Sequence, residues 1–343
     1  MSSQDIVEKR GTAAPQPKQR QVLVNFAANY GLAVIFVLVL IVFGLMRPDT
    51  YLSRSNIGNL LTSQSVTALL ALAVMMPLTT GRFDLSVGYH VGLAQVLMVG
   101  LQANQQLPWV VSAIIVLAVG AAVGAINGFL VTRFKIDSFI ATMGVGSLLY
   151  GLSNWYTQGM QISGLQLPAG YLSVAGDIFG IPFPAIIVLL VGIILWIVLE
   201  RIPAGRSLYF IGFNPRAAEL SGINVGRAVN AAFISSGLLC ALAGIMLGAI
   251  LRSGTPSVGP EYLLPAFAAS LLGATSIRPG RVNVGGTLLS ILILAFSFSG
   301  VQQLGAAFYV EYLFNGGILV VAVALSVYAA ARRRKSAVHS SAH

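Results

Sequence analysis

The chain has 343 residues, of which 56% are hydrophobic and only 9% are charged. A soluble globular protein carries about 25% charged residues, so this composition excludes an ordinary soluble domain and indicates a chain that lies in lipid. The net charge of +10 would also suit a nucleic-acid-binding protein, but the placement of the basic residues, described below, argues against that class.

The N-terminal segment is polar and basic, and a long apolar stretch follows it and ends near Met46. A cleavable signal peptide would have a shorter apolar core and small residues before its cleavage site. Here Phe43, Leu45 and Met46 precede Arg47, which is a poor cleavage site. We therefore expect a retained first span that follows a cytoplasmic basic tail at 1–25.

The long apolar runs predict an all-α membrane protein, a bundle of about ten transmembrane helices. A helix needs about 20 mostly apolar residues to cross the hydrocarbon core, and its backbone groups must be hydrogen-bonded internally. The expected spans are 26–46, 57–79, 85–101, 108–132, 138–158, 182–199, 227–250, 262–277, 282–303 and 312–331. The run at 262–277 is short and contains Pro265. The transmembrane domain is thus expected at 26–331, with a second cytoplasmic tail at 332–343.

The basic residues predict the orientation of the spans. With the N-terminus inside, all but three of the 20 lysines and arginines fall on the inner face, and the three exceptions are Arg47, Arg54 and Arg252. An excess of lysine and arginine in cytoplasmic loops is the rule for such proteins. We therefore expect a multi-pass protein of the bacterial plasma (inner) membrane with both termini in the cytoplasm. The same distribution explains the basic charge without a nucleic-acid partner.

A long outer loop is expected between the fifth and sixth spans, from Gly159 to Pro182, with further prolines at Pro168 and Pro184. Its turn-forming composition suits a surface that faces a partner or gates the outer mouth of the bundle. The alternative is a disordered connector.

The interior of the predicted spans is polar in places but almost free of charge. Ion- and proton-coupled carriers usually need buried ionisable residues, and their absence argues that the energy for transport enters elsewhere. Amide side chains can pass a neutral polyhydroxy solute, because each hydrogen bond replaces one to water. The candidates for a translocation path are Gln64, Gln95, Asn127, Asn154 and Asn315. The alternative for each residue is that it joins two helices.

A first motif, Thr80-Gly-Arg-Phe-Asp-Leu-Ser-Val-Gly88, lies between the second and third spans. Gly81 permits a tight turn, and Asp84 or Ser86 can cap the start of the third helix. Asp84, which lies beside Arg82 at the inner boundary, is therefore interpreted as a cap that also forms a surface ion pair with Arg82.

A second motif lies in the inner loop at about 201–226, between the sixth and seventh spans. Asn214 can cap a short helix, Pro215 can begin it and Gly222 can end it. A helix of about two turns is not stable alone, so a partner surface must hold it. The alternative, a helix lying on the lipid headgroups, is weakened because its faces lack a wide apolar stripe.

These two motifs resemble those of the permease subunits of ribose, xylose, arabinose and galactose type ABC importers. The resemblance extends from about Tyr51 to Tyr328, and includes the stretches 125–144 and 271–287. At the junction of the second and third spans the matching residues are Gly81, Phe83, Asp84, Ser86 and Gly88. Ile277 to Val284 is poorer in glycine than that family usually is.

The resemblance implies a ten-helix permease that works as a dimer with a second permease copy, either identical or different. It also implies two cytoplasmic ATP-binding subunits and a periplasmic or other extracytoplasmic sugar-binding protein. In such permeases the short inner helix seats in a groove of the ATPase and couples it to the bundle. Carried over to this chain, the coupling helix comprises Asn214, Arg216, Ala217, Ala218, Glu219 and Gly222. Arg216 stands where these importers often have glutamate.

The expected function is therefore the permease subunit of an ABC importer for a monosaccharide or a similar neutral polyhydroxy solute. The chain has no G-x-x-x-x-G-K-[ST] loop, so we expect ATP hydrolysis on a separate chain, no enzymatic activity here and no bound cofactor. His90 is on no ligand spacing and Cys240 lies in an apolar run, so no metal site is expected. The alternatives are a stand-alone secondary carrier or facilitator, and a membrane-embedded enzyme, which would need an interior cluster of acids, histidines or metal ligands.

Overall fold

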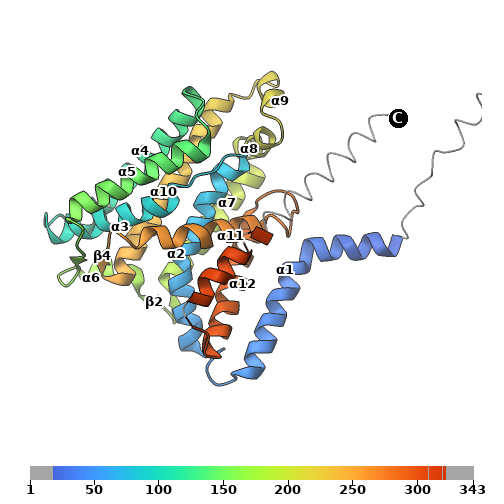
Figure 1. Ribbon diagram of the computed structural model, residues 1–343, viewed down its shortest axis with the longest axis horizontal. Helices are drawn as coiled ribbons and strands as arrows, with labels where there is room; N and C mark the ends of the chain where they lie inside the picture. The colour runs from blue at the N-terminus through green and yellow to red at the C-terminus, as the bar shows by residue number, and fades with distance from the viewer. Residues whose placement is uncertain (1–17, 308, 319, 322–343) are drawn as a thin grey trace, which may run out of the picture.

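The computed structural model describes residues 18–307, 309–318 and 320–321, and the side chains from residue 30 onward. The described chain is a helical bundle (Figure 1). Its longer helices are α1 (Lys18–Met46), α2 (Arg54–Thr79), α3 (Val87–Ala103), α4 (Trp109–Arg133), α5 (Ser138–Thr157), α7 (Phe183–Arg201), α10 (Val225–Leu251) and α12 (Val284–Gln303). The shorter ones are α6 (Ala169–Leu172), η1 (Ser173–Ala175), α8 (Pro203–Phe213), α9 (Pro215–Leu220), η2 (Gly259–Tyr262) and α11 (Leu263–Gly273). Residues 309–318 are also helical.

Each predicted span up to 282–303 coincides with one of these helices, and most boundaries agree within a few residues. The run predicted at 312–331 lies mostly outside the described residues, as do the tail at 332–343 and most of the tail at 1–25. In the described part, α2, α4, α7, α10 and α12 are long and apolar enough to cross a membrane, and α3 is a shorter apolar helix. The chain is thus an α-helical membrane protein. The number of ten spans and the cytoplasmic termini stay predictions.

The centre of the bundle is formed by α2 and α10. The C-terminal half of α2 is buried almost without interruption, and α10 packs against α2, α3 and α4. The peripheral helices expose large apolar side chains, among them Ile114 on α4, Leu148 on α5 and Leu189 on α7. A surface of this kind is stable in lipid, where the hydrocarbon is as apolar as the side chains.

The connections between helices gather at two ends of the bundle. One end holds the α2–α3 and α4–α5 connections next to α8 and α9, with residues 80–82, 131–138 and 212–226 around one cavity. At the other end Thr50 donates a hydrogen bond to Gln303, and Tyr156 donates one to Gln105. Figure 1 shows α9 and the α1–α2 turn at opposite ends. We call them the inner and the outer end, following the orientation expected from the basic residues.

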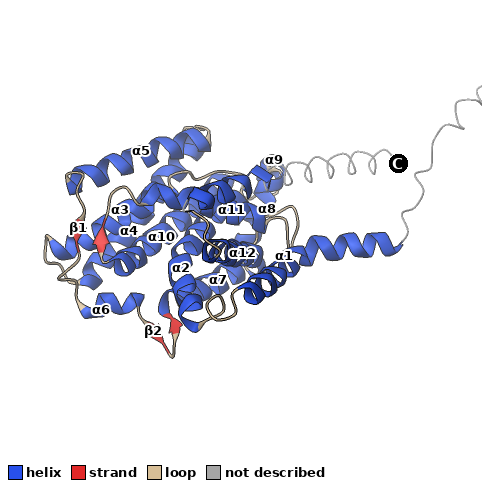
Figure 2. Cartoon of the chain, turned by 60° about the horizontal axis from the view of Figure 1, so that its bottom comes forward, coloured by secondary structure: helices blue, strands red, loops and turns tan. Residues whose placement is uncertain are grey.

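The outer connection between α5 and α7 is folded, so the disordered connector considered above is excluded. It contains β1 (Ile162–Ser163), α6, η1 and the hairpin of β2 (Asp177–Ile178) with β3 (Ile181–Pro182). Figure 2 shows the β2–β3 hairpin projecting beyond the helices. Tyr171 is fully buried and donates a hydrogen bond to the carbonyl of Ile245 on α10, at 2.8 Å.

The chain re-enters the bundle after α10 without forming a continuous helix. The segment at 252–262 first pairs with the outer connection through β4 (Ser253–Gly254), which is antiparallel to β1. The Gln95 amide on α3 donates a hydrogen bond to the Ser253 carbonyl at 2.7 Å. Deeper in, Gly88 of α3 approaches Gly259 so closely that a Cβ at Gly259 would lie 2.2 Å from the Gly88 carbonyl oxygen. Non-helical backbone is tolerated at this depth only where protein buries it or where it lines a cavity.

The first helix lies at the edge of the bundle beside α12 (Figure 1). Tyr51, just after α1, is fully buried and donates a hydrogen bond to the Phe296 carbonyl of α12 at 2.9 Å. Its ring also contacts Phe43 and Phe296, at centroid distances of 5.6 and 6.1 Å.

Candidate functional site

A polar cavity of about 290 Å³ lies between α2, the η2–α11 segment, α12 and the helix at 309–318. Its lining includes Gln64 and Thr67 near the middle of α2, and Ile291 and Leu294 near the middle of α12. The remaining lining residues are Ser63, Pro260, Glu261, Tyr262, Leu264, Pro265, Ala295, Phe298, Glu311, Tyr312 and Asn315. The cavity therefore lies at mid-depth of the bundle, where the chain is not a continuous helix.

Two polar side chains of the lining belong to residues that are almost fully buried. Asn315 is 8% exposed and Thr67 is 5% exposed. Within the described residues neither side chain makes a hydrogen bond. Neither side chain is among the polar groups that are fully buried without a partner, so the polar atoms of both residues are accessible from the cavity. The two side chains can therefore form hydrogen bonds with water or with a polar molecule in the cavity.

Two carboxylates, Glu261 and Glu311, also line this cavity. Neither glutamate is among the residues predicted for the path, because each lies one residue before the start of an expected span, 262–277 and 312–331. For Glu261 the sequence did contain a signal. This acid directly precedes an apolar run and follows Pro256 and Pro260, which mark a non-helical entry to that run.

The structure brings together only part of the expected translocation path. Gln64 and Asn315 line the same cavity. Gln95 is fully buried and holds the re-entrant segment. Asn127 is buried elsewhere, beside Asp84. Asn154 lies near the outer end of α5 and donates a hydrogen bond to the Tyr150 carbonyl of its own helix, at 2.9 Å.

The short helix expected in the inner loop is present as α9. The Asn214 side chain caps it by accepting a hydrogen bond from the Ala217 amide at 3.1 Å, and Gly222 follows with φ at +81°. Ala218 is fully buried against the bundle, whereas Arg216 and Glu219 are exposed. The face of α9 that is open to a partner is therefore formed by Arg216 and Glu219, while Ala218 holds the helix in place.

Two large apolar side chains flank the same face. Phe213, at the end of α8, is 69% exposed, and Leu220, at the end of α9, is 85% exposed. They lie at the inner end, next to the charged side chains of Arg216 and Glu219. Exposed apolar residues that are rimmed by polar ones mark an interaction site.

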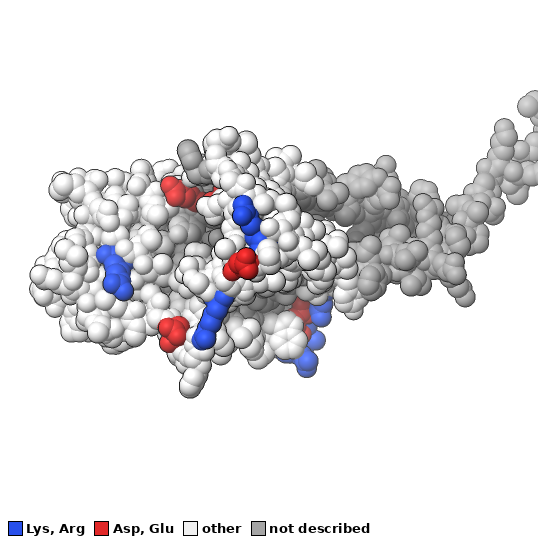
Figure 3. Space-filling view, turned by 90° about the horizontal axis from the view of Figure 1, so that it is seen from below, with Lys and Arg blue, Asp and Glu red and all other residues white. Residues whose placement is uncertain are grey.

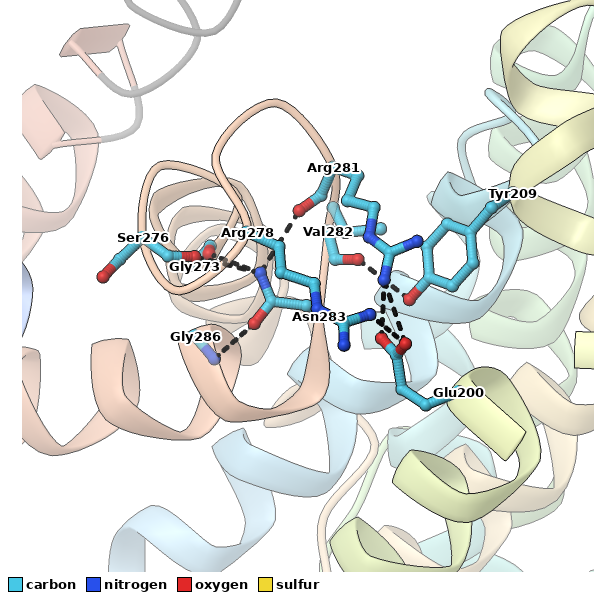
Figure 4. A network of polar contacts seen from close by, with 9 residues as sticks. All are labelled: Glu200, Tyr209, Gly273, Ser276, Arg278, Arg281, Val282, Asn283 and Gly286. Carbon is cyan, nitrogen blue, oxygen red and sulfur yellow. Dashed lines mark hydrogen bonds and ion pairs between the residues drawn. The ribbon is translucent and has the colours of Figure 1, made fainter. Parts of the chain in front are cut away.

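The residues before α9, predicted to be part of the inner loop, form the helix α8. Tyr209 of α8 donates a hydrogen bond to the Val282 carbonyl at 3.0 Å (Figure 4). Burial raises the pKa of Tyr209 to about 12, so the phenol keeps the proton that it donates. The guanidinium of Arg281 lies over the Tyr209 ring, 4.3 Å from its centroid. Tyr209 therefore joins α8 to the α11–α12 connection.

The α11–α12 connection is fixed further by an ion-pair cluster. Glu200, near the end of α7, pairs with Arg281 at 2.8 Å and also with Arg278 (Figure 4). Asn283 accepts a hydrogen bond from the Gly286 amide at 2.8 Å and donates to three carbonyls, those of Gly273, Ser276 and Arg281. The segment that is poorer in glycine than the family usually is, 277–284, therefore contacts α7 and α8, and it does not line the mid-depth cavity.

Asp84 corrects one interpretation of the first motif. It is only 2% exposed, so it does not form a surface ion pair with Arg82. Its carboxylate accepts hydrogen bonds from the Ser86 amide at 3.1 Å and the Ser86 hydroxyl at 2.6 Å. It also accepts one from Ser236 of α10 at 2.8 Å, and Asn127 of α4 donates to both Ser86 and Asp84. Asp84 thus joins the start of α3 to α4 and α10.

The rest of the first motif is joined to α5. The Phe83 amide donates to the Ser138 hydroxyl at 3.1 Å, and the Leu85 amide donates to the Thr142 hydroxyl at 2.9 Å. Gly81 makes the expected tight turn, with φ at +74°.

His90 and Cys240 are both buried and belong to no candidate metal site. In the part of the chain that the structure describes, no three histidine, cysteine, aspartate or glutamate side chains are grouped so that they could hold a metal ion.

Residues 56–323 match the family model described as the permease component of the branched-chain amino acid transport system. The chain is 38% identical to the ribose import permease protein of Bacillus subtilis, over 88% of this chain and 92% of that protein. It is 34% identical to the ribose import permease protein of Escherichia coli K12, over 85% and 91%. It is 30% identical to the D-allose transport system permease protein of the same strain, over 88% and 93%. No solved structure matches the chain significantly.

Proposed function

Because the chain belongs to this family of transport-system permease components, we propose that it is the membrane-spanning subunit of an ABC importer that carries a monosaccharide inward, driven by a separate ATPase. The relatives are import permeases for ribose and allose. The observation that carries the solute class is the mid-depth cavity with its unpartnered Asn315 and Thr67.

The size and the groups of the cavity fit a monosaccharide. Small-molecule sites span about 300 to 1,000 Å³, and this cavity, at about 290 Å³, is at the small end. Gln64, Asn315 and Thr67 offer donors and acceptors, while Tyr262 and Tyr312 offer aromatic surface. Each hydroxyl of a sugar can then exchange a hydrogen bond with water for one with the protein.

The charge of the cavity disfavours an amino acid, the solute in the family model's description. An amino acid carries an ammonium group, which the two glutamates could bind, but also a carboxylate, which needs a cationic or strongly donating partner when it leaves water. The lining residues include Glu261 and Glu311 but no lysine, arginine or histidine. A neutral polyhydroxy solute brings only hydroxyl groups to these carboxylates.

The inner end fits the docking of an ATP-binding subunit. The face formed by Phe213, Arg216, Glu219 and Leu220 is open at the tip of the molecule. Closure of an ATPase pair on ATP would displace α9, and α8 would pass the movement to the α11–α12 connection through Tyr209. The bundle would then exchange its inward-open and outward-open states.

The outer end fits a solute-binding protein as the second partner. The folded connection between α5 and α7 forms part of this surface, and it is fixed to α10 by Tyr171. Figure 3, which views the outer end, shows few and scattered charges on a largely uncharged face. A second permease copy completes the assembly that we propose.

The secondary carrier remains a second candidate because of a specific observation. Ionisable residues within the spans of a membrane protein commonly mark proton or ion pathways. Asp84 is buried in the bundle, and Glu261 and Glu311 line the mid-depth cavity.

Reconstitution distinguishes the two candidates. Proteoliposomes are prepared with the permease alone, with the permease and its ATPase, and with both plus the binding protein, and uptake of radiolabelled ribose is measured. We expect ATP-dependent uptake only in the complete system. Uptake by the permease alone, driven by a proton or sodium gradient, would instead establish the carrier.

A further inference from the structure

The two glutamates of the mid-depth cavity come from segments far apart in the sequence. Glu261 lies in η2, at the end of the re-entrant segment, and Glu311 lies in the helix at 309–318. The segment that carries Glu261 is held by the close approach of Gly88 and Gly259 and by the Gln95 hydrogen bond. Its backbone is therefore fixed, and Glu261 stays at the wall of the cavity.

Neither carboxylate is compensated by a described residue. In the part of the chain that the structure describes, neither Glu261 nor Glu311 forms an ion pair or a hydrogen bond. No lysine, arginine or histidine lines the cavity with them. Glu261 is exposed and Glu311 is partly buried, so both carboxylates are accessible at the wall of the cavity and act on a solute that contacts them.

Neutral polar side chains line the cavity beside the two carboxylates. Asn315 and Thr67 are more than nine-tenths buried and line the same cavity without a partner among the described residues. A neutral sugar donates hydroxyl hydrogens to carboxylates and exchanges hydrogen bonds with the amide. A sugar phosphate or sugar acid brings a further negative charge, which the carboxylates repel.

We propose that Glu261 and Glu311 form a charge filter within the permease itself, which admits neutral polyhydroxy solutes and rejects their anionic derivatives. This inference rests on the proposed function, because it concerns the solute that the permease carries. It adds a selection step inside the membrane to whatever selection precedes it at the outer surface.

The direct test measures binding without transport. The full-length permease, in lipid nanodiscs, is mixed with ribose or with ribose 5-phosphate, and saturation-transfer NMR reports which solute contacts the protein. We expect the wild type to contact ribose and to contact the phosphate at least about tenfold less, the equivalent of about 1.4 kcal/mol. The double variant Glu261→Gln with Glu311→Gln should lose most of that difference, with an intermediate effect for each single variant.

A matched control removes one acid elsewhere. Asp49 is exposed at the outer turn between α1 and α2 and does not line the cavity. Asp49→Asn should keep the wild-type preference for ribose. An unchanged preference in the double variant, or equal contact of both solutes with the wild type, would overturn the filter.

A second measurement covers the case in which the double variant does not fold. A hydrophobic carbodiimide modifies accessible glutamates of the wild-type protein in nanodiscs, and peptide mass spectrometry reports the modified positions. We expect ribose, but not ribose 5-phosphate, to protect Glu261 and Glu311. Protection by both solutes or by neither contradicts the proposal. The proposed function fails separately, if the complete wild-type transporter imports no sugar.

Discussion

At the residue scale, Asp84 is a carboxylate buried without a cationic partner among the described residues. Removing a charge from water has a cost of several kcal/mol, which hydrogen bonds must offset. Asp84 receives such bonds from Ser86, Ser236 and Asn127. A hydrogen bond to a charged group contributes about 1.5 to 3 kcal/mol. The donors are therefore as important to the bundle as the carboxylate.

Two neighbouring serines of α10, Ser236 and Ser235, test how much a donor to Asp84 contributes to stability. Ser236→Ala removes a buried donor to Asp84, and we expect a loss of about 1 to 3 kcal/mol in stability, seen as a lowered melting temperature of the purified permease. Ser235 is only partly buried, and among the described residues it donates only to the Ala231 carbonyl of its own helix. Ser235→Ala should change stability by less than about 0.5 kcal/mol. Equal effects of the two substitutions would show that Ser236 does not stabilise Asp84.

At the element scale, α9 has only six residues and depends on its cap and on the burial of Ala218. Asn214→Ala removes the side-chain acceptor for the Ala217 amide, which at a helix N-cap costs about 1 kcal/mol. We expect faster hydrogen exchange of the backbone amides at 215–221 and weaker ATP-driven uptake. Asn214→Ser keeps an oxygen at the cap and should restore both. An exchange rate at 215–221 that is unaffected by Asn214→Ala would contradict this role of the cap.

The α11–α12 connection depends on Glu200 in a similar way. Glu200→Gln removes the charge that Arg278 and Arg281 share, so the amides at 274–283 should exchange faster with solvent. Glu219 is an exposed acid on α9 that forms no ion pair with a described residue. Glu219→Gln is therefore the control and should leave exchange at 274–283 unchanged. If exchange at 274–283 is the same in both variants and the wild type, the ion pairs do not hold this connection.

The long elements were predictable from the sequence because lipid imposes length and apolarity on them. The run 108–132 predicted α4, and the run 227–250 predicted α10. The signals of Asn214, Pro215 and Gly222 also predicted α9 with its cap. Local chemistry of this kind acts within a few residues of the chain.

The parts that could not be predicted depend on contacts between distant segments. The hydropathy of 203–213 does not show that Tyr209 would reach Val282, so α8 was taken for a loop. Asp84 was assigned to the surface because its partner Ser236 is far away in sequence. Glu261 and Glu311 were placed outside the expected spans because an acid ends an apolar run. In the structure both line the cavity, and Glu261 reaches it on the re-entrant backbone.

At the scale of the whole molecule, the expected orientation is testable with single cysteines. The native Cys240 is fully buried and should not react. In right-side-out membrane vesicles, Asp49→Cys should react with a membrane-impermeant maleimide, whereas Arg216→Cys should react only after permeabilisation. Both positions are exposed at opposite ends of the bundle. Labelling of Arg216→Cys in intact vesicles would invert the orientation that we infer from the basic residues.

The position of α1 has a consequence for how the protein is made. Helix α1 packs mainly against α12, and Tyr51, which follows α1, adds a hydrogen bond to the Phe296 carbonyl of α12. A ribosome delivers α1 to the membrane first and α12 only after most of the chain has been translated. Helix α1 must therefore remain in the bilayer without its contacts to α12 until α12 has been inserted. The packing of α1 against α12 is then a late step in the assembly of the bundle.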